Sequence, residues 1–257
     1  MLPDERRKEI VRKVNSADRV TVEELTDEFG VSGATIRRDL ASLAEDGLIE
    51  RFHGGALPAS DDGTADAGDG DTLKNPNGKR AIAGRAVEEL GDGDAVFFDT
   101  GQTTMQVAKE IPDGVSLLVA TNSPENAFEL RESCGEVKVV GDSLRPTSDA
   151  LVGPSGESYL RKTNFDIVFL ETDAIQEDGS LSVSNEDEAR IKSLLVDSGH
   201  RVVLVADGSK LGRQSFREFA TVDDIDVFIT DVALSDEMAA VFERASVRVV
   251  DSQLVVS

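Results

Sequence analysis

The chain has 257 residues, a formal net charge of −23 from 50 acidic and 27 basic side chains, and 39% hydrophobic residues. These values suit one large or two small globular domains and exclude a disordered chain. No apolar run approaches the roughly 18 residues that span a bilayer, and the opening MLPDERRKEI is no signal peptide, so we expect a soluble cytoplasmic protein. A single cysteine, Cys134, excludes a disulfide framework, and we expect no cofactor and no metal.

The acidic charge argues against a nucleic-acid partner only at first sight. Acidic residues are spread over every segment, and nine lysines stand beside 18 arginines. This pattern resembles halophilic proteins, whose acidic surfaces keep them hydrated. In molar salt the Debye length falls to about 3 Å, so local charge pairs matter more than net charge.

Residues 1–57 carry the signals of a small DNA-binding domain. The first helical pattern has apolar residues at Ile10, Val11 and Val14, and a second helix follows. Thr21 and Glu24 form a capping-box pattern at the start of that second helix, and Gly30 ends it. Ser32 caps a third helix that runs to about Asp46, and GLIERFHGGAL alternates like a hairpin around Gly54 and Gly55. Three helices and a hairpin predict a winged helix-turn-helix.

The third helix contains the pair Arg37 and Arg38 in the stretch TIRRDL. At 100° per residue, Ile36, Leu40 and Leu43 form the buried stripe, and both arginines project from the opposite side. An isolated arginine pair on a helix is commonly a solvated surface feature. Here the preceding helix, the turn and the hairpin favour a DNA-reading face, because arginine binds guanine and phosphate. The candidate DNA-binding residues are Ser32, Thr35, Arg37, Arg38, Ser42, Arg51 and His53.

The hairpin residues Arg51 and His53 lie where a wing tip meets phosphates. The alternative role of His53 is that of a metal ligand. No second histidine or cysteine lies nearby in the sequence, and the other histidine of the chain is His200.

Residues 58–78 are rich in Asp and Gly and predict a linker. From residue 79 to 257, apolar runs alternate with helical spacing, which predicts an α/β domain with a mainly parallel sheet. The predicted strands are 95–98, 116–120, 137–140, 166–170, 201–206, 227–230 and 247–250. The predicted helices are 80–90, 103–110, 124–132, 186–198 and 235–245.

Polar residues follow these strands directly, and the carboxyl edge of a parallel sheet is where α/β proteins bind ligands. The loop DTGQTT, residues 99–104, opens a helix and offers N–H groups to an anion. Ser and Thr also cap helices without any ligand. With Thr121–Ser123 and Lys210 at neighbouring strand ends, the pattern favours a phosphorylated ligand.

The chain resembles the DeoR family of sugar-metabolism repressors, also called GlpR-type regulators. The N-terminal likeness runs through TIRRDL to RFHGGAL. The C-terminal likeness rests on DTGQTT, TNS, GDSLR, ALVG, DIVFLETDAI and DGSK. It implies a fold similar to ribose-5-phosphate isomerase and a sugar-phosphate sensor with Asp99, Gly101, Thr103, Thr104, Asn122, Asp173 and Lys210 around the ligand. Two positions depart from the family pattern. Asp142 stands where the family usually has Gly, and the stretch Glu171–Ile175 reads ETDAI where the family usually has GADGI.

The resemblance implies a repressor that a phosphorylated sugar or glycerol 3-phosphate releases from an operator in double-stranded DNA. A symmetric operator implies a dimer or tetramer. An alternative is a sugar-phosphate isomerase with an appended DNA-binding module. Its carboxylate base would come from Glu171, Asp173, Glu186 or Glu188. A third possibility is an activator, since the sequence decides neither the sign of regulation, nor the regulated genes, nor the effector.

Overall fold

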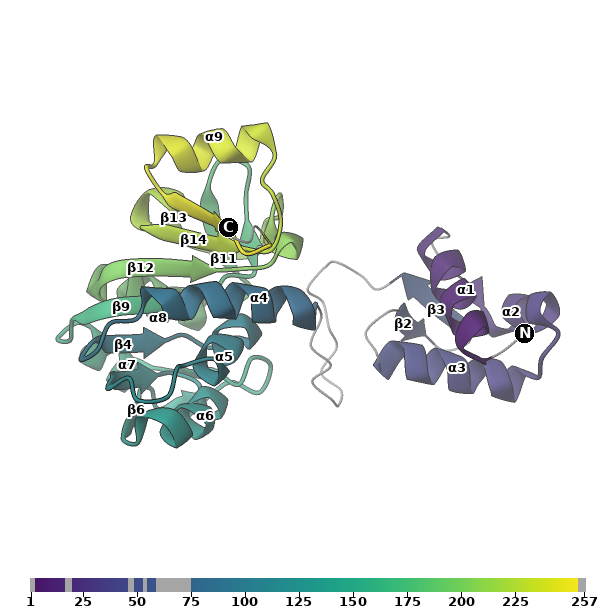
Figure 1. The fold of residues 1–257 in the computed structure, drawn as a ribbon, viewed down its shortest axis with the longest axis horizontal. Helices are drawn as coiled ribbons and strands as arrows, with labels where there is room; N and C mark the ends of the chain where they lie inside the picture. The colour runs from purple at the N-terminus through teal and green to yellow at the C-terminus, as the bar shows by residue number, and fades with distance from the viewer. Residues whose placement is uncertain (1–2, 17–19, 46–48, 53–54, 59–74, 254–257) are drawn as a thin grey trace. The chain divides into compact units, whose positions relative to one another are not determined.

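The computed structural model describes residues 3–16, 20–45, 49–52, 55–58 and 75–253 (Figure 1). The chain divides into two compact units, Met1–Lys74 and Asn75–Ser257. Each unit has its own hydrophobic core. Among the helices of the described residues, none has the length and apolarity that crossing a bilayer requires.

The N-terminal unit is a winged helix-turn-helix. Its strands form a three-stranded antiparallel sheet in the order β1-β3-β2, in which Phe52 pairs with Gly55. The two wing strands are therefore paired as the alternation of residues 47–57 predicts. The elements are α1 (Pro3–Ser16), β1 (Val20–Thr21), α2 (Val22–Phe29), α3 (Gly33–Glu45), β2 (Ile49–Phe52) and β3 (Gly55–Pro58).

The predicted caps of this unit are present. The Thr21 side chain accepts a hydrogen bond from the backbone N–H of Glu24, and the Glu24 carboxylate accepts one from the backbone N–H of Thr21. Gly30 ends α2 in the left-handed conformation, at φ 61°. A capping box of this kind contributes about 1 kcal/mol to helix stability. The turn between α2 and α3 is thus fixed by local interactions.

The C-terminal unit is built on a seven-stranded, fully parallel sheet in the order β15-β14-β12-β9-β4-β5-β6. Every apolar run predicted as a strand is one of these seven strands, which confirms the parallel α/β class. The strands are β4 (Ala95–Phe98), β5 (Leu118–Thr121), β6 (Val137–Val139), β9 (Phe165–Leu170), β12 (Gly199–Val205), β14 (Val227–Thr230) and β15 (Arg248–Asp251).

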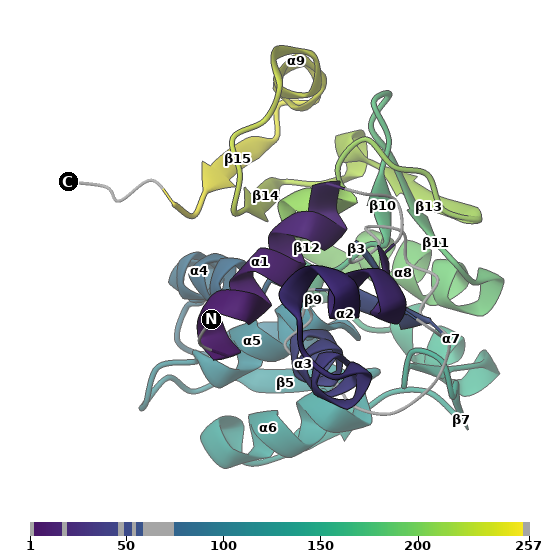
Figure 2. The ribbon, with the colours of Figure 1, turned by 90° about the vertical axis from the view of Figure 1, so that its right-hand side faces the viewer.

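Both faces of this sheet are covered, because successive strand residues point to opposite sides. Val96 and Phe98 of β4 belong to one core cluster, while Phe97 belongs to the other. Figures 1 and 2 show α4, α5 and α6 side by side on one face. These helices span Pro76–Ala86, Gln102–Lys109 and Pro124–Cys134. On the other face pack α7 (Pro154–Leu160), α8 (Glu186–Ser198) and α9 (Asp236–Arg244).

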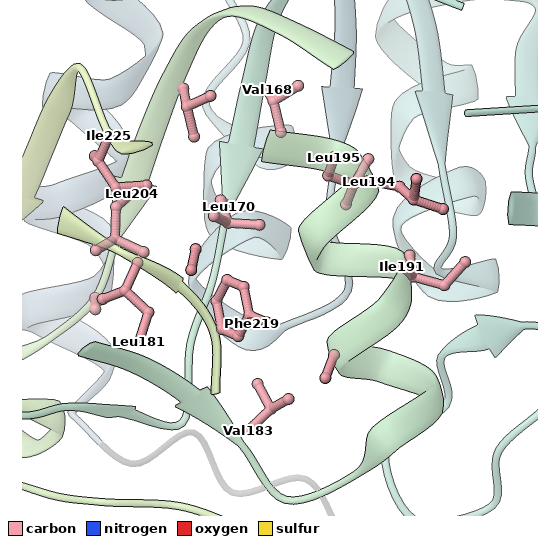
Figure 3. Packing of buried hydrophobic residues seen from close by; sticks show 14 of the residues in the cluster. Val168, Leu170, Leu181, Val183, Ile191, Leu194, Leu195, Leu204, Phe219 and Ile225 are labelled. Atoms are coloured by element: carbon pink, nitrogen blue, oxygen red, sulfur yellow. The ribbon is translucent and has the colours of Figure 1, made fainter. Parts of the chain in front are cut away.

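A small antiparallel sheet adds to the α8 side and was not predicted. It has the order β10-β11-β13 and spans Ala174–Ile175, Ser180–Val183 and Arg217–Thr221. Figure 3 shows its Leu181 and Val183 facing Leu170 of β9 and the leucines of α8. A two-stranded ribbon, β7 (Ser143–Leu144) with β8 (Leu151–Val152), and three short 3₁₀ turns, η1 (Val87–Glu89), η2 (Gly208–Lys210) and η3 (Val222–Asp224), complete the unit.

The chain order places the functional site. Strands β4, β5 and β6 run outward in one direction, and the chain then returns to lay β9 against the other side of β4. The sheet therefore has a topological switch point between β4 and β9, where open α/β sheets bind ligands. Helix α4 begins at Pro76, inside the stretch 58–78 that the sequence predicts as linker, because Asn75 caps it.

Candidate functional sites

The recognition helix α3 presents its arginine pair as the helical wheel predicts. Ile36, Leu40 and Leu43 are buried, and Arg37 and Arg38 are exposed. Within the described part of the chain, neither guanidinium has an ion-pair or hydrogen-bond partner. Two cations that need no internal partner are available to an external anion.

The start of α3 is held by hydroxyl groups. The Ser32 Oγ accepts a hydrogen bond from the Thr35 backbone N–H at 3.2 Å, and the two hydroxyl oxygens lie 2.9 Å apart. Ser32 is exposed and Thr35 half-buried, so both lie at the surface beside the arginine pair. Ser42 is on α3 and Arg51 is on β2, although their side chains are outside the described set, and His53 lies outside the described residues altogether.

A buried ion pair behind α3 was missed by the sequence analysis. Asp39, the acid of TIRRDL, is 3% exposed and accepts a 2.7 Å hydrogen bond from the Arg6 Nε on α1. The Arg7 Nε lies 3.4 Å from its other oxygen. The pair fixes α3 against α1, so the recognition helix is presented as a rigid element.

In the C-terminal unit, Asp99 lies at the centre of the switch point. It follows β4, is fully buried, and uses both carboxylate oxygens inside the protein. Oδ1 accepts from the Thr100 backbone N–H at 2.9 Å, and Oδ2 accepts from the Glu171 backbone N–H at 3.2 Å and from Lys192 Nζ. The Asp99 carboxylate thus joins the ends of β4 and β9 to α8.

The N-terminus of α5 already holds a carboxylate, that of Glu171 at the end of β9. Its Oε2 accepts from the backbone N–H groups of Thr103 and Thr104 at 3.0 and 3.3 Å. Its Oε1 accepts from the Thr103 hydroxyl at 3.1 Å. Gly101 has φ 155°, and a Cβ there would lie 1.9 Å from Oε2, so only glycine leaves room for this carboxylate.

Thr104 orders the same loop from within. It is fully buried, and its hydroxyl donates to the Asp99 carbonyl oxygen at 2.7 Å and lies 2.9 Å from the Gly101 carbonyl oxygen. Asn126 of α6 donates a further hydrogen bond to the Asp99 carbonyl, at 2.9 Å. The loop 99–104 is therefore held by internal hydrogen bonds, with the Thr103 and Thr104 N–H groups directed at the Glu171 carboxylate.

Three lysines surround the Glu171 carboxylate. Burial raises the pKa of Glu171, while the charges of Lys79, Lys210 and Lys192 act to lower it. Lys79 and Lys192 are 7% and 5% exposed. Burial also acts to lower the pKa of Lys192, but Asp99 and further carboxylates outweigh that effect, so the pKa lies above its ordinary value. Lys192 is thus charged at neutral pH.

The sequence pattern predicts Lys210 at this site but neither Lys79 nor Lys192. Both lie on helices, α4 and α8, so the rule that polar residues follow strands does not reach them. The chain has nine lysines, so each lysine is a candidate for a specific role, and this signal applies equally to Lys79, Lys192 and Lys210.

The remaining predicted effector residues lie at adjoining strand ends. Asn122 follows β5, is 2% exposed, and its Oδ1 has no hydrogen-bond partner within the described structure. Such an orphaned buried oxygen is typical of a site that a ligand completes. Asp173 follows β9, is exposed, accepts a hydrogen bond from the Ser184 N–H at 2.8 Å, and its charge acts on Lys192. The structure therefore brings the predicted effector residues together around one edge of the sheet.

Helix α4 connects this edge to the segment that precedes it. Asn75 caps α4 and donates a 2.6 Å hydrogen bond to Asp231, which follows β14. The other oxygen of Asp231 accepts from the Gly208 N–H at 2.9 Å, two residues before Lys210. Lys79 Nζ lies 4.0 Å from Asp207. The first turn of α4 is therefore clamped to the loops that carry Lys210.

The other acids considered as isomerase bases have different surroundings. Glu188 accepts hydrogen bonds from Arg145 at 3.0 Å and from Ser148 at 2.7 Å, which ties the loop after β7 to α8. Glu186 is exposed in the first turn of α8. No group of three or more metal-binding side chains occurs in the part of the chain that the structure describes.

A winged helix-turn-helix with two exposed arginines on its third helix, joined in one chain to an α/β domain with a polar site at its switch point, defines a ligand-responsive transcriptional regulator. Comparison with known proteins gives the particular family. The profile of the DeoR-like helix-turn-helix domain matches residues 6–61, and that of the DeoR C terminal sensor domain matches residues 74–232.

The relatives agree with these profiles. The HTH-type transcriptional regulator GlpR of Haloferax volcanii is 51% identical over 251 residues, which is 98% of each chain. The glycerol-3-phosphate regulon repressor of Escherichia coli K12 is 31% identical over 233 residues, 90% of this chain and 92% of the relative. A solved ribose 5-phosphate isomerase A from Methanocaldococcus jannaschii is similar over 54% of this chain and 55% of its own, with a TM-score of 0.40 and 19% identity.

The chain belongs to the DeoR family. It is a transcriptional repressor of the DeoR/GlpR type, with a DNA-binding domain and a sensor domain, and the isomerase alternative is not supported.

Proposed function

We propose that the repressor binds operator DNA through α3 and the wing and is released when a phosphorylated sugar or glycerol 3-phosphate binds at the α5 N-terminus. The observation that carries this proposal is that the α5 amide groups already hold a carboxylate, that of Glu171, on whose charge Lys79, Lys210 and Lys192 act. Backbone donors together with several lysines at one helix N-terminus suit a dianionic phosphate. The name of the Escherichia coli relative supports glycerol 3-phosphate as one compound to test.

The DNA contacts divide between base reading and phosphate binding. Arg37 and Arg38 are exposed in the N-terminal half of α3, the part of a recognition helix that contacts base edges. The short polar residues Ser32, Thr35 and Ser42 suit phosphate contacts along the same helix, and Arg51 and His53 suit phosphates beside the wing. A symmetric operator would be read by a dimer or tetramer of this chain.

The effector residues divide into contact and positioning groups. Thr103 and the loop amides, Asn122 and Lys210 are proposed to contact the ligand, since each offers a polar group at the switch point. Asp99, Gly101 and Thr104 are proposed to position the loop, because Asp99 and Thr104 already bond within the protein. Asp173 is proposed to face the sugar hydroxyls from the exposed end of β9. Lys79 and Lys192 extend the set that the sequence predicts.

The signal is proposed to leave the site through α4. Its first turn carries Lys79 at the ligand and Asn75 beside the segment that leads to the DNA-binding domain. A ligand that displaces Lys79 or the Asp231 loop changes how α4 is held. Release needs a free-energy coupling of about 1–3 kcal/mol, which is a 5- to 150-fold change in DNA affinity.

The working environment follows from the charge of the chain and from its relative. We place the repressor in the cytoplasm of a salt-accumulating cell, since the net charge is −23 and the 51% identical relative comes from Haloferax volcanii. Binding experiments therefore belong in multi-molar KCl.

The test is thermal unfolding in multi-molar KCl against phosphorylated sugars, glycerol 3-phosphate and the matching unphosphorylated compounds. A ligand at about 100 times its Kd stabilises a protein by roughly 2.7 kcal/mol. We expect one phosphorylated compound to raise the Tm of the wild type and of Lys138→Ala, an exposed lysine on β6, but not of Lys210→Ala. An equal Tm rise in Lys210→Ala would place the phosphate elsewhere.

A further inference from the structure

The anion seat of α5 consists of the Thr103 and Thr104 backbone N–H groups and the Thr103 hydroxyl, and all three donors are already engaged. The Glu171 carboxylate accepts from each of them, at 3.0, 3.3 and 3.1 Å. These are the donors that the proposed function gives to the phosphate of the effector. Ligand and side chain therefore compete for the same hydrogen bonds.

The surroundings of this carboxylate match those of a bound anion. Glu171 is 9% exposed, Gly101 has no Cβ to exclude it, and three lysines act on its charge. At the adjoining strand end, the buried Oδ1 of Asn122 lacks a partner within the described structure. The α5 donors are thus occupied, while the Asn122 Oδ1 keeps capacity for a further hydrogen bond.

A comparison within the chain separates this arrangement from ordinary capping. Asp142 also accepts a hydrogen bond from a helix N-terminus, that of Ser155 on α7, at 3.0 Å. It is exposed, and this hydrogen bond lowers its pKa. Glu171 is buried, and its burial raises its pKa. The Asp142 carboxylate caps α7 in contact with solvent, whereas the Glu171 carboxylate is withdrawn from solvent, and this desolvation makes it the easier of the two to displace with a competing anion.

We propose that Glu171 is an internal stand-in for the effector's phosphate, holding the α5 seat until a phosphorylated ligand displaces it. The residue then sets the ligand threshold of the sensor. If the seat is vacant in roughly one-tenth of molecules, the apparent affinity falls about tenfold. Because Glu171 directly follows β9 and its backbone N–H donates to the Asp99 carboxylate, displacement also moves the end of β9 at the switch point. This inference rests on the proposed phosphate-sensing function.

The test compares Glu171→Gln and Glu171→Gly with the wild type and with Asp142→Asn, the matched control on the exposed helix cap. Isothermal titration in KCl measures the Kd of inorganic phosphate and of the phosphorylated compound that stabilises the protein most. The glutamine variant keeps the shape of the side chain and removes its charge, and the glycine variant empties the seat. Thermal unfolding of each variant confirms that it is folded.

We expect both Glu171 variants to bind phosphate and the phosphorylated compound about tenfold more tightly, with Asp142→Asn unchanged. Adding Thr103→Val to Glu171→Gln should remove the gain, because it deletes a seat donor. Equal or weaker binding by the Glu171 variants would overturn the stand-in role and leave the phosphate site in place. If no variant binds any phosphorylated compound, the proposed function fails as well.

Discussion

The recognition helix and the effector site place their cations in opposite ways. Arg37 and Arg38 are exposed and have no partner within the described residues, whereas Lys192 and Lys79 are buried and face carboxylates. DNA supplies the negative charges that bind Arg37 and Arg38, so these arginines need no acidic partner within the protein. A small-ligand site must be electrically balanced while it is empty. Losing an exposed arginine should weaken DNA binding, and losing one partner of the buried Lys192–Asp99 pair should lower the free energy of unfolding.

The DNA-binding domain also contains charges of the second kind. Asp39, which directly follows Arg38 on the recognition helix, is buried in an ion pair with Arg6 of α1. The stretch TIRRDL therefore combines both uses of charge within six residues. Its arginines face outward for DNA, and its aspartate faces inward for the fold.

Breaking the balance of the effector site should give the largest effect. Asp99→Ala leaves Lys192 buried without its closest carboxylate and deprives the Glu171 N–H of its acceptor. We expect a loss of about 3–5 kcal/mol in the free energy of unfolding, the range for one partner removed from a buried pair. Thermal unfolding in KCl measures it.

The control for this prediction is the double variant Asp99→Asn with Lys192→Met, which removes both charges and keeps side-chain volume. It should recover most of the lost stability, since a buried pair is often replaceable by uncharged residues. A single-variant loss below about 1 kcal/mol, in the range of an exposed pair, would contradict the contrast drawn here.

At the recognition helix the same kind of change should leave stability alone. Arg37→Ala or Arg38→Ala should weaken DNA binding by about 1–3 kcal/mol, the range of a bidentate arginine contact. The free energy of unfolding should stay within about 0.5 kcal/mol. Fluorescence anisotropy with DNA that the wild type selects from a random library measures the affinity.

Arg131→Ala, an exposed arginine on α6, is the matched control and should leave DNA affinity unchanged. Full DNA affinity in both α3 variants would show that Arg37 and Arg38 are solvated surface residues and do not contact DNA.

The smallest expected effect is a pH dependence at Glu171. Its pKa lies above the ordinary value near 4.5 because the group is buried, and Lys79, Lys210 and Lys192 offset this only in part. The folded state then binds the proton more tightly than the unfolded state, so stability falls as pH rises from about 4.5 through the folded pKa. Glu171→Gln lacks this loss.

We therefore expect the Tm of Glu171→Gln to gain on that of the wild type as pH rises above about 4.5, and the difference to level off at higher pH. Tm measurements of both proteins in the same KCl concentration give this difference directly. A gap that is constant or shrinks with rising pH would mean that the carboxylate is stabilised, rather than strained, in its seat.

The sequence predicted all seven strands of the parallel sheet and none of the strands of the small antiparallel sheet β10-β11-β13. The seven parallel strands are continuous apolar runs such as AVFF, because both their faces are buried. The strand Ser180–Val183 is equally buried, but its serines hide the run, and its neighbour Ala174–Ile175 has two residues. Helix α7 contains Gly156 and Ser residues and spans seven positions, too few for a helical pattern to emerge.

The positions of the candidate site residues were predictable where one element carries the signal. The arginine pair follows from the helical wheel of α3 alone, and Asp99, Asn122 and Lys210 follow from their positions after strands. Lys79, Lys192 and the Arg6–Asp39 pair depend on which helix face packs against which strand end, and sequence spacing does not contain that information. The hydrogen bonds from the α5 N-terminus to Glu171 join residues 68 apart in the chain. They form because β4 and β9 are neighbours at the switch point, which sequence spacing does not reveal.

The central claim is that one chain couples an anion at the switch point to DNA held by α3. The direct test is anisotropy of library-selected DNA bound to the wild type and to Lys210→Ala, while the stabilising phosphorylated compound is titrated in KCl. We predict that DNA affinity falls 5- to 150-fold for the wild type, the usual range of such coupling, and stays constant for Lys210→Ala. DNA affinity that no stabilising compound changes in the wild type would contradict the claim.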